Sequence, residues 1–358
     1  MPAQSAPRRT ANVIGLGLVG GSIGLGLRQR GWQVCGDDSR VETIERALAI
    51  GAIDRAGLDP DADVTFVAVP VLAVADQVKR ALVETTGVVT DVGSVKAPIC
   101  VACTDLRFIG GHPMAGSELD GLDGADGEMF SGAVWVLTPG TNADDRTLTT
   151  VSAIVQSLGA EVVALSPDRH DQVVAVISHV PHLTAATLMT LASDRAEEHA
   201  ALLRLAAGGF RDMTRIASGH PAIWLDICAE NRPAIVTALD GLIERLSEVR
   251  TVVDNQDRDS LQRTLTHARE ARTNLPGRVT HPEALAEVRI PIPDRPGAAA
   301  EVFTLAAELG VNIASFEVVH MAESNRGVAV VIVDLSTSER FRGGLIARGF
   351  KPAVTPLA

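Results

Sequence analysis

The sequence predicts three domains: an α/β domain of the Rossmann type, an all-α dimerisation domain and a small α+β domain with a ferredoxin-like order. Three observations along the 358 residues predict them. Short apolar segments alternate with helical patterns up to about residue 166, a helical period follows without strands, and strand patterns return near residue 287. The expected domains are therefore residues 1–166, 167–272 and 287–358, with a linker at 273–286.

The first domain contains seven short apolar segments separated by helical patterns, an order typical of βαβ units around a parallel sheet. Ligands of such sheets bind at the carboxyl ends of the strands, so residues that follow different strands converge on one site. The expected strands are Asn12–Ile14, Gln33–Gly36, Asp63–Val69, Val88–Val92, Arg107–Gly110, Val134–Thr138 and Glu161–Leu165.

The second region has an apolar stripe along one long helical segment. Charged residues such as Glu244 and Arg245 occupy the other faces of that segment. The stripe must be buried against its own domain or against a second subunit, and we favour a homodimer. It consists of Ile235, Val236, Leu239, Leu242, Ile243, Leu246 and Val249.

The third region follows a stretch that contains Leu275-Pro276-Gly277 and His281-Pro282, which is typical of a linker. Strand and helix patterns then succeed one another in a βαββα order with a final short strand, which predicts a ferredoxin-like fold. The expected strands are Glu287–Pro291, Val311–Met321, Gly327–Leu335 and Lys351–Val354, and the expected helices are Gly297–Gly310 and Ser338–Arg348.

Charge and composition limit the classes of partner. The formal charge of −12 and the pI near 5.2 argue against nucleic acid or an anionic membrane, because both require a basic face. The first residues lack a secretory pattern, and four cysteines are too few for a disulfide scaffold, so we expect a cytoplasmic protein. Cys100 and Cys103 have metal-ligand spacing without a second pair nearby, which favours packing over zinc binding.

A Gly-x-Gly-x-x-Gly motif between the first strand and the following helix predicts a dinucleotide site. Gly15 permits the tight turn, Gly17 lets the backbone approach a pyrophosphate, and Gly20 lets helix and strand pack closely. The amides of Leu18 and Val19 then face the phosphates at the start of the helix. A glycine-rich turn without a ligand is the alternative.

The acidic residue expected about 20 positions after the motif argues for a ligand. Asp37 and Asp38 follow the second strand, and we choose Asp38 as the residue that binds the ribose hydroxyls. A carboxylate there repels a 2′-phosphate, so NAD is expected in preference to NADP. Arg40 lies close enough to leave some use of NADP open.

Four further segments, in this order along the chain, resemble the prephenate and arogenate dehydrogenases of tyrosine biosynthesis. They are Val92–Lys96, Gly110–Glu118, Ser178–His182 and Phe210–Ala217, the last followed by Trp224. The resemblance extends from the first strand to about residue 270. It implies an oxidative decarboxylation, in which a cyclohexadiene with a ring carboxylate and a C4 hydroxyl loses hydride to NAD⁺ and then CO₂.

The resemblance also gives His112 and Ser94 catalytic roles. A neutral imidazole at a strand end is a suitable acceptor for the C4 hydroxyl proton, so His112 is the expected base. Ser94, at another strand end, can orient that hydroxyl or the imidazole. In isolation, His112 next to a proline would more often be a turn residue with a backbone partner.

A guanidinium that binds one substrate carboxylate bidentately would fix the substrate, and Arg215 matches best. Arg211 is the competitor. Asp212 and Arg215 could instead form a surface ion pair, while the resemblance makes Asp212 and Glu118 gating groups.

By resemblance His182 and Trp224 line the substrate pocket. His179 and His182 could be metal ligands, with His170 or Asp171 as a third, but this chemistry requires no metal, so we expect none. We favour prephenate over arogenate, because His182 can serve a keto acid without a carboxylate for an ammonium group.

The last domain is similar to ACT domains, which bind amino-acid effectors, in its segments Asp294–Ala298 and Gly310–Ile313. In those domains the turn and the asparagine frame a pocket, often where two domains meet. We therefore expect Asp294, Gly297 and Asn312 to bind tyrosine, with oligomerisation alone as the alternative.

Two other functions stay open. A β-hydroxy acid dehydrogenase has a similar domain order but relies on a lysine in its helical region, and this chain has no lysine between Lys96 and Lys351. A non-catalytic sensor of NAD and amino acids is the second, and turnover would exclude it.

Overall fold

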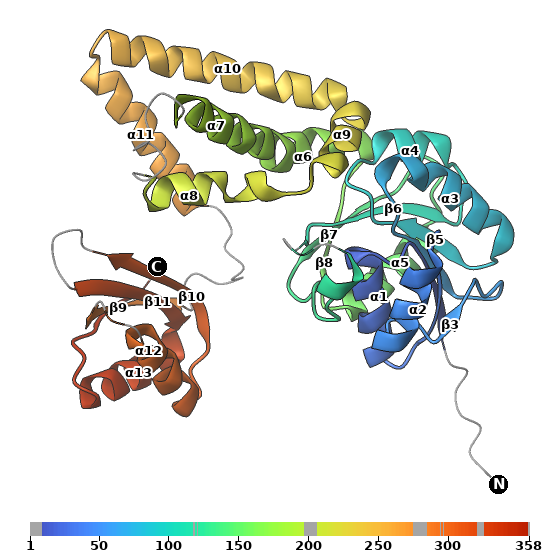
Figure 1. Ribbon diagram of the computed structural model, residues 1–358, viewed down its shortest axis with the longest axis horizontal. Coiled ribbons are helices and arrows are strands. Elements are labelled where there is room, and N and C mark those ends of the chain that lie inside the picture. Colours follow the sequence, from blue (N-terminus) through green and yellow to red (C-terminus); the bar gives the residue numbers. More distant parts are fainter. Residues whose placement is uncertain are drawn as a thin grey trace. The chain divides into compact units, whose positions relative to one another are not determined.

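The computed structural model describes residues 9–116, 119, 121–196, 206–274, 285–293, 295, 297–320 and 326–356. The chain divides into two compact units, Met1–Asp257 and Arg258–Ala358. The first unit contains the Rossmann-type sheet and the helices α1 to α10, and the second contains the helix α11 and a smaller sheet (Figure 1).

The large sheet of the first unit has eight strands in the order β3-β2-β1-β4-β5-β6-β7-β8. All seven predicted strands are present, with bounds shifted by up to three residues, and the very short β3 was not predicted. The strands are β1 (Thr10–Ile14), β2 (Gln33–Asp37), β3 (Arg55–Ala56), β4 (Val64–Val67), β5 (Val88–Asp91), β6 (Phe108–Pro113), β7 (Val134–Thr138) and β8 (Glu161–Ala164).

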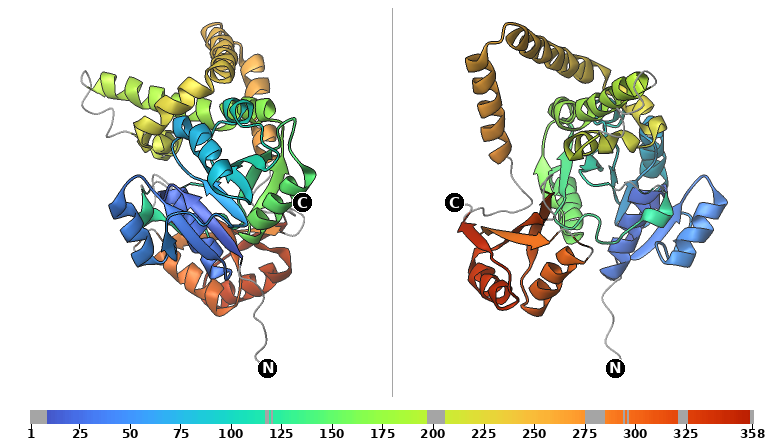
Figure 2. Two further views of the ribbon diagram at one scale, coloured as in Figure 1. Left: turned by 90° about the vertical axis from the view of Figure 1, so that its right-hand side faces the viewer. Right: turned by 60° about the vertical axis from the view of Figure 1, so that its left-hand side comes forward.

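Helices cover both faces of this sheet (Figure 2). Successive strand residues point to opposite faces, so Val13 belongs to the apolar core under α1 and α5, whereas Ile14 belongs to the core under α3 and α4. Each face of the sheet therefore has its own apolar core, and the strands are packed between the two cores. The helices are α1 (Leu18–Gln29), α2 (Val41–Ile50), α3 (Val71–Glu84), α4 (Ala97–Ala102) and α5 (Asp145–Ser157).

The expectation of a wholly parallel sheet is wrong at one position, because β6 and β7 are antiparallel. The described residues between them hold only a short 3-10 turn, η1 (Leu122–Gly124), and a parallel connection normally requires a crossover helix. β6 also continues through Pro113 rather than ending at Gly110. His112 consequently lies inside the strand, opposite Val136, instead of beyond its end.

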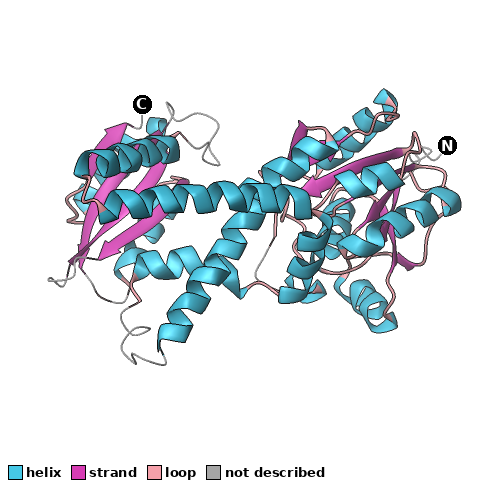
Figure 3. Ribbon diagram, turned by 90° about the horizontal axis from the view of Figure 1, so that it is seen from above, coloured by secondary structure: helices cyan, strands magenta, loops and turns pink. Residues whose placement is uncertain are grey.

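The described residues from 166 to 257 are helical or irregular, as predicted, and Figure 3 draws no strand among them. The Ser166 hydroxyl accepts from the Arg169 amide, and Pro167 occupies the first turn, so α6 begins there. The elements are α6 (Pro167–Val174), the π-helical turn η2 (Ala175–His179), α7 (Val180–Ala196), α8 (Gly208–Thr214), the 3-10 turn η4 (Arg215–Ser218), α9 (Pro221–Glu230) and α10 (Arg232–Asp254).

The continuous helical run Pro167–Arg195 has the length and apolar composition of a membrane span. Core helices meet the same two criteria. This run also carries buried polar side chains, His170, Asp171, His179 and His182, that bond or stack with other parts of the first unit. A third of its most apolar window is buried inside the structure.

The predicted stripe on α10 is mostly exposed in the single chain. Ile235 is buried in a cluster with Ala175 of η2 and Ile227 of α9, whereas Ile243 and Leu246 are 58% and 57% exposed. Val236, Val249 and Val253 are exposed as well. Exposed apolar residues on one face of a helix are typical of a surface that another surface covers.

The second unit begins with α11 (Arg258–Thr273) and continues as an antiparallel sheet in the order β10-β11-β9-β12 with two helices. The predicted ferredoxin-like order is present. α13 begins at Leu335 rather than Ser338, because the Asp334 carboxylate accepts from the Ser336 amide and caps it there. The other elements are β9 (Leu285–Pro293), α12 (Ala298–Glu308), β10 (Ile313–His320), β11 (Arg326–Asp334), α13 (Leu335–Ala347) and β12 (Ala353–Pro356).

Candidate active site

The three glycines of the loop between β1 and α1 have different surroundings. Gly15 has a φ of +89°, and a Cβ there would lie 2.3 Å from the Ala68 carbonyl oxygen. A Cβ at Gly20 would lie 1.9 Å from the Gly15 carbonyl oxygen, whereas one at Gly17 would meet no atom within 4 Å. The chain's own packing therefore requires Gly15 and Gly20, while Gly17 borders open space that a ligand can approach.

The start of α1 offers backbone donors at this open position. Leu18 and Val19 form its first turn and are partly exposed, and no side chain caps the helix at Gly17. The first N–H groups of a helix have no partner within it, and the helix dipole favours negative charge there. The loop therefore fits a pyrophosphate.

The two aspartates after β2 point in different directions. Asp38 Oδ2 accepts from the Leu16 amide at 2.9 Å, so this carboxylate lies against the glycine loop. Asp37 Oδ2 instead pairs with Arg80 of α3 at 2.7 Å. Asp38 also accepts from the Arg40 amide, yet each carboxylate oxygen keeps a second acceptor site for a ribose hydroxyl.

A fully buried ion pair supports the next two strand ends. Lys96 Nζ contacts Asp91 Oδ2 and donates to the Gly111 carbonyl at 2.8 Å, and both charged side chains are 0% exposed. The carboxylate of Asp91 also accepts from the amides of Gly93 and Gly111. The pair thus joins the end of β5, the loop that carries Ser94 and the middle of β6.

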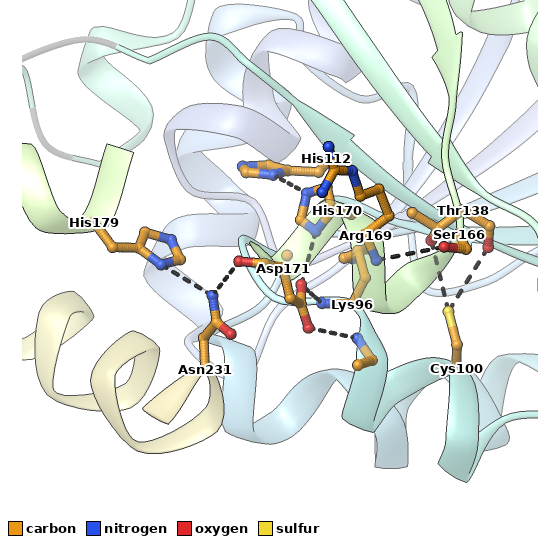
Figure 4. Close-up of polar contacts among 12 residues, drawn as sticks. Lys96, Cys100, His112, Thr138, Ser166, Arg169, His170, Asp171, His179 and Asn231 are labelled. Atoms are coloured by element: carbon orange, nitrogen blue, oxygen red, sulfur yellow. Dashed lines mark hydrogen bonds and ion pairs between the residues drawn. The ribbon is translucent and has the colours of Figure 1, made fainter. Parts of the chain in front are cut away.

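His112 follows two glycines that let β6 pack closely on its neighbours, Gly110 against Thr138 of β7 and Gly111 against β5. A Cβ at Gly111 would lie 2.6 Å from the Asp91 carbonyl oxygen. The imidazole of His112 is 9% exposed, and its Nδ1 lies 2.8 Å from Nε2 of His170 on α6. His170 Nδ1 in turn lies 2.7 Å from Asp171 Oδ1, so the three side chains form one hydrogen-bonded row (Figure 4).

Asp171 anchors this row to the rest of the unit. Its two carboxylate oxygens accept from the amides of Lys96 and Ala97, each at 2.8 Å, at the start of α4. Its carbonyl accepts from Asn231 Nδ2 at 2.8 Å, between α9 and α10. The row consequently links the Rossmann-type sheet to the helices that follow it (Figure 4).

Burial lowers the pKa of His112 well below its usual value of 6.5. The neighbouring His170, Lys96 and His179 add smaller effects in the same direction, because a charge on His112 would be repelled. His112 is therefore neutral at physiological pH and can accept a proton, as its expected role requires.

A second group of rings lies on the helical side of the first unit. His182 stacks on Trp224 with ring centroids 3.6 Å apart, and His179 meets the edge of the same indole. His179 Nδ1 contacts Asn231 Nδ2 at 3.2 Å, whereas its buried Nε2 has no partner among the described residues. Burial lowers the pKa of His179 to about 4.

Comparison with known proteins places these features in one family. The nucleotide-binding domain model of prephenate dehydrogenase matches residues 23–164, and its dimerization domain model matches residues 166–267. The prephenate dehydrogenase of Bacillus subtilis is 33% identical over 89% of this chain and 90% of its own length. This chain belongs to the prephenate dehydrogenase family.

Two solved structures of the family are similar as well. Prephenate dehydrogenase from A. aeolicus, in complex with hydroxyphenyl propionate and NAD⁺, has a TM-score of 0.71 and 28% identity, over 76% of this chain and all of that one. Synechocystis arogenate dehydrogenase has a TM-score of 0.64 and 31% identity, over 74% of this chain and 98% of that one. With the glycine loop, these matches make the chain an NAD-dependent oxidoreductase with a dimerisation domain.

The predicted site residues Ser94, Asp212 and Arg215 are less buried than His112. Ser94 is half-buried after β5, and no hydrogen bond joins it to His112. Arg215 is exposed at the start of η4, and Asp212 is exposed one turn earlier on α8. Arg211 donates to the Ala206 carbonyl at 3.2 Å.

The turn that carries Arg215 does lie beside the ring pair. A Cβ at Gly219, just after η4, would lie 3.3 Å from His182 Cε1 and 3.4 Å from Trp224 Nε1. Glu118 lies outside the described residues. No group of three or more histidine, cysteine, aspartate or glutamate side chains with metal-binding geometry occurs in the described part of the chain.

Sequence reasoning missed the residues that hold His112 in place. His170 and Asp171 were considered only as metal ligands, and Asn231 was not considered. One signal was available in the sequence: His170 and Asp171 are adjacent, near the start of a predicted helix. Which strand they would face could not be derived from the helix pattern alone.

In the small sheet domain, the expected effector residues lie far apart. Gly297 precedes α12 with a φ of +89°, and Asn312 follows the same helix, so the 11 residues of α12 separate them. At about 1.5 Å per residue this is on the order of 16 Å. Within one copy of the domain, Gly297 and Asn312 therefore lie at opposite ends of α12. Asp294 lies outside the described residues.

Proposed function

We propose that this chain catalyses the NAD-dependent oxidative decarboxylation of prephenate to 4-hydroxyphenylpyruvate, with His112 as the base. The observation that carries the proposal is the buried, neutral imidazole of His112 in the strand next to the Ser94 loop, held by His170. Membership of the prephenate dehydrogenase family supports the reaction class.

The chemistry requires one proton acceptor and no metal. The C4 hydroxyl loses its proton to His112 as hydride leaves C4, so the oxygen becomes a carbonyl. The bond to the ring carboxylate then breaks, and its electron pair moves through the ring to that oxygen as CO₂ departs. The oxygen regains the proton, which leaves a phenol. Ser94 is proposed to orient the hydroxyl.

NAD, when bound, supplies the acceptor for the hydride. The open backbone at Gly17 and the amides of Leu18 and Val19 are proposed to hold its pyrophosphate, and Asp38 the adenine-side ribose. Gly15 and Gly20 are proposed to shape the loop around the pyrophosphate. Arg40 is too exposed to neutralise Asp38 fully, which favours NAD over NADP.

Arg215 is proposed to bind a substrate carboxylate, since η4 lies beside His182 and Trp224. Arg211 stays the alternative, although its guanidinium already donates to Ala206. His182 and Trp224 are proposed to line the pocket, and Glu118 and Asp212 to act as gating groups. This assignment follows the family resemblance and the position of η4.

Prephenate, a keto acid, is favoured over arogenate because an amino group would require a carboxylate partner. Asp171 already accepts from His170 and from two backbone amides, and Asp91, the other buried carboxylate near His112, is paired with Lys96. Burial lowers the pKa of His182, which keeps that ring neutral and suited to a keto acid.

The test is NADH formation by the purified chain with NAD⁺ and either prephenate or arogenate. Turnover with prephenate alone supports the proposal, and turnover with arogenate alone would keep the mechanism and overturn the substrate. No NADH formation with either substrate, in a protein that binds NAD, would favour the sensor function.

The assembly is proposed to be a cytoplasmic homodimer formed through the exposed face of α10, within the dimerisation domain. The domain limits 1–166, 167–272, 273–286 and 287–358 are part of the same proposal. Equilibrium sedimentation of wild type and of a variant with Ile243→Glu tests the dimer, because the charge should dissociate it.

The last domain is proposed to be an ACT domain that binds tyrosine as an inhibitory effector. Its ferredoxin-like order supports this. With Gly297 and Asn312 at opposite ends of α12, we propose that the site lies where two copies of the domain meet. Isothermal titration with tyrosine, phenylalanine and tryptophan tests it. No heat with any of the three would leave oligomerisation as the role of the domain.

A further inference from the structure

The hydrogen-bonded row from Asp171 through His170 to His112 determines where each proton lies. Asp171 Oδ1 and Oδ2 accept from the amides of Lys96 and Ala97, and backbone amides can only donate. Both oxygens of the Asp171 side chain thus act as acceptors, as those of a carboxylate do, and a carboxylate has no proton to give. Consequently His170 Nδ1, 2.7 Å from Oδ1, must carry the proton of that hydrogen bond.

The same reasoning extends to His112. With a single proton on its ring, His170 carries that proton at Nδ1, so His170 Nε2 has a free lone pair. That nitrogen lies 2.8 Å from His112 Nδ1, which must then donate. In a neutral His112 the proton on Nδ1 leaves Nε2 as the unprotonated nitrogen.

We propose that His170 and Asp171 are positioning residues, which hold His112 in the tautomer that carries its proton on Nδ1 and presents Nε2 as the base. This rests on the proposed role of His112. Two hydrogen bonds separate Asp171 from the ring of His112. Neither His170 nor Asp171 needs to touch the substrate.

The row also stabilises the charge that the reaction creates. When the substrate O–H bond breaks, an N–H bond forms at Nε2 of His112, and the ring becomes an imidazolium. Its Nδ1–H keeps donating to His170, whose own N–H donates to the carboxylate of Asp171. The proton stays at Nε2 and is available to return to the product oxygen.

Two other titratable side chains act on His112, and each already has a partner. Lys96 from the β5–α4 loop is paired with Asp91, and His179 from the π-helical turn binds Asn231. Asp171 supplies the carboxylate at one end of the row. It therefore determines the direction of the row's hydrogen bonds.

The first measurement is nitrogen NMR of histidine-labelled wild-type protein, with His112→Asn to assign the His112 signals. We expect a neutral His112 ring protonated at Nδ1. A ring protonated at Nε2 would overturn the proposal, and this result needs no destabilised variant.

The second measurement compares His170→Leu with His170→Gln. Leucine removes the acceptor for His112 Nδ1, so the ring can adopt either tautomer. Glutamine can offer its carbonyl oxygen to the same N–H. We expect His170→Leu to lower kcat on the order of 10²-fold, with the KM for prephenate and the Kd for NAD within about 2-fold of wild type, and His170→Gln to restore much of kcat.

The two hypotheses fail in different ways. If His112→Asn keeps wild-type kcat, the proposed role of His112 is wrong. If His112→Asn is inactive but His170→Leu keeps wild-type kcat and tautomer, only the positioning role is wrong. Equal losses in the Leu and Gln variants, with an unchanged His112 tautomer, would assign His170 a packing role instead.

Discussion

His112 and Arg215 differ in how far the rest of the single chain encloses their side chains. His112 is buried, bonded to His170 and supported by a buried ion pair on the neighbouring strand. Arg215 and its neighbours on α8 and η4 are exposed. The group proposed to accept the proton is held in place by the chain itself, whereas the groups expected to bind substrate are not enclosed.

This difference agrees with what each region has to do. A general base must hold one tautomer and one orientation in every turnover, which a buried hydrogen-bonded row provides. A substrate-binding surface must open and close, and the dimerisation domain also has an exposed apolar face on α10. Mutations in the two regions should therefore have different kinetic effects.

The largest effect is expected for His112→Asn. Asparagine fits the strand but cannot act as the base, so kcat should fall by about 10²–10⁴, while the Kd for NAD changes little. Steady-state kinetics and titration with NAD measure both. His267→Asn, an exposed histidine on α11, is the matched control and should retain wild-type kcat. A normal kcat in His112→Asn would mean that another group is the base.

The next effect is on stability rather than on chemistry. Lys96→Met leaves Asp91 buried without its cation, which should lower the free energy of unfolding by about 3–5 kcal/mol. Urea unfolding measures this, with Lys79→Met on the exposed side of α3 as control, expected within about 0.5 kcal/mol of wild type.

A double variant sharpens the Lys96 result. Asp91→Asn together with Lys96→Met removes both charges, so part of the lost stability should return. If Lys96→Met were as stable as Lys79→Met, the buried pair would not be what supports β5 and β6.

Much of the fold followed from local patterns. The strands of the large sheet and the order of the small one were predictable because strand patterns, glycines and helix starts are encoded within a few residues. The direction of β7 was not, since it depends on the length of the connection after β6 and not on the pattern of β7 itself. The start of α13 depended on one cap, Asp334.

The site residues also divide into those that a local motif predicts and those that depend on long-range packing. The glycine loop and Asp38 could be placed because the motif is local, and His112 because its neighbours in sequence resemble a family motif. The partnership of His112 with His170 spans 58 positions and depends on how α6 meets β6. The role of Lys96 was missed for a similar reason, because burial of a lysine is a property of the packed fold.

Arg215→Ala is expected to act on substrate binding and not on the chemical step. Loss of a charge-assisted hydrogen bond pair of about 1.5–3 kcal/mol corresponds to a KM for prephenate roughly 10- to 100-fold higher, with kcat changed much less. Arg211→Ala, measured in parallel, should leave KM near wild type. The reverse ranking would move the carboxylate anchor to Arg211.

The smallest expected effect is the response of kcat/KM to mild acid. A base is active without its proton, and burial lowers the pKa of His112 well below 6.5, so His112 stays unprotonated as the pH falls from about 8 to 6.5. We expect kcat/KM to change by less than about 2-fold over that range and to fall only at lower pH.

The same pKa shift should appear in stability, with a sign that can be checked. An unfolded histidine takes up a proton near pH 6.5, whereas folded His112 and His179, the latter with a pKa of about 4, do not. The unfolded state therefore binds more protons below pH 6.5, and the free energy of unfolding should decline from there toward pH 4. An acid limb of kcat/KM centred at or above pH 6.5, without this decline, would mean that His112 is solvated, and the contrast between its buried row and the exposed Arg215 turn would not hold.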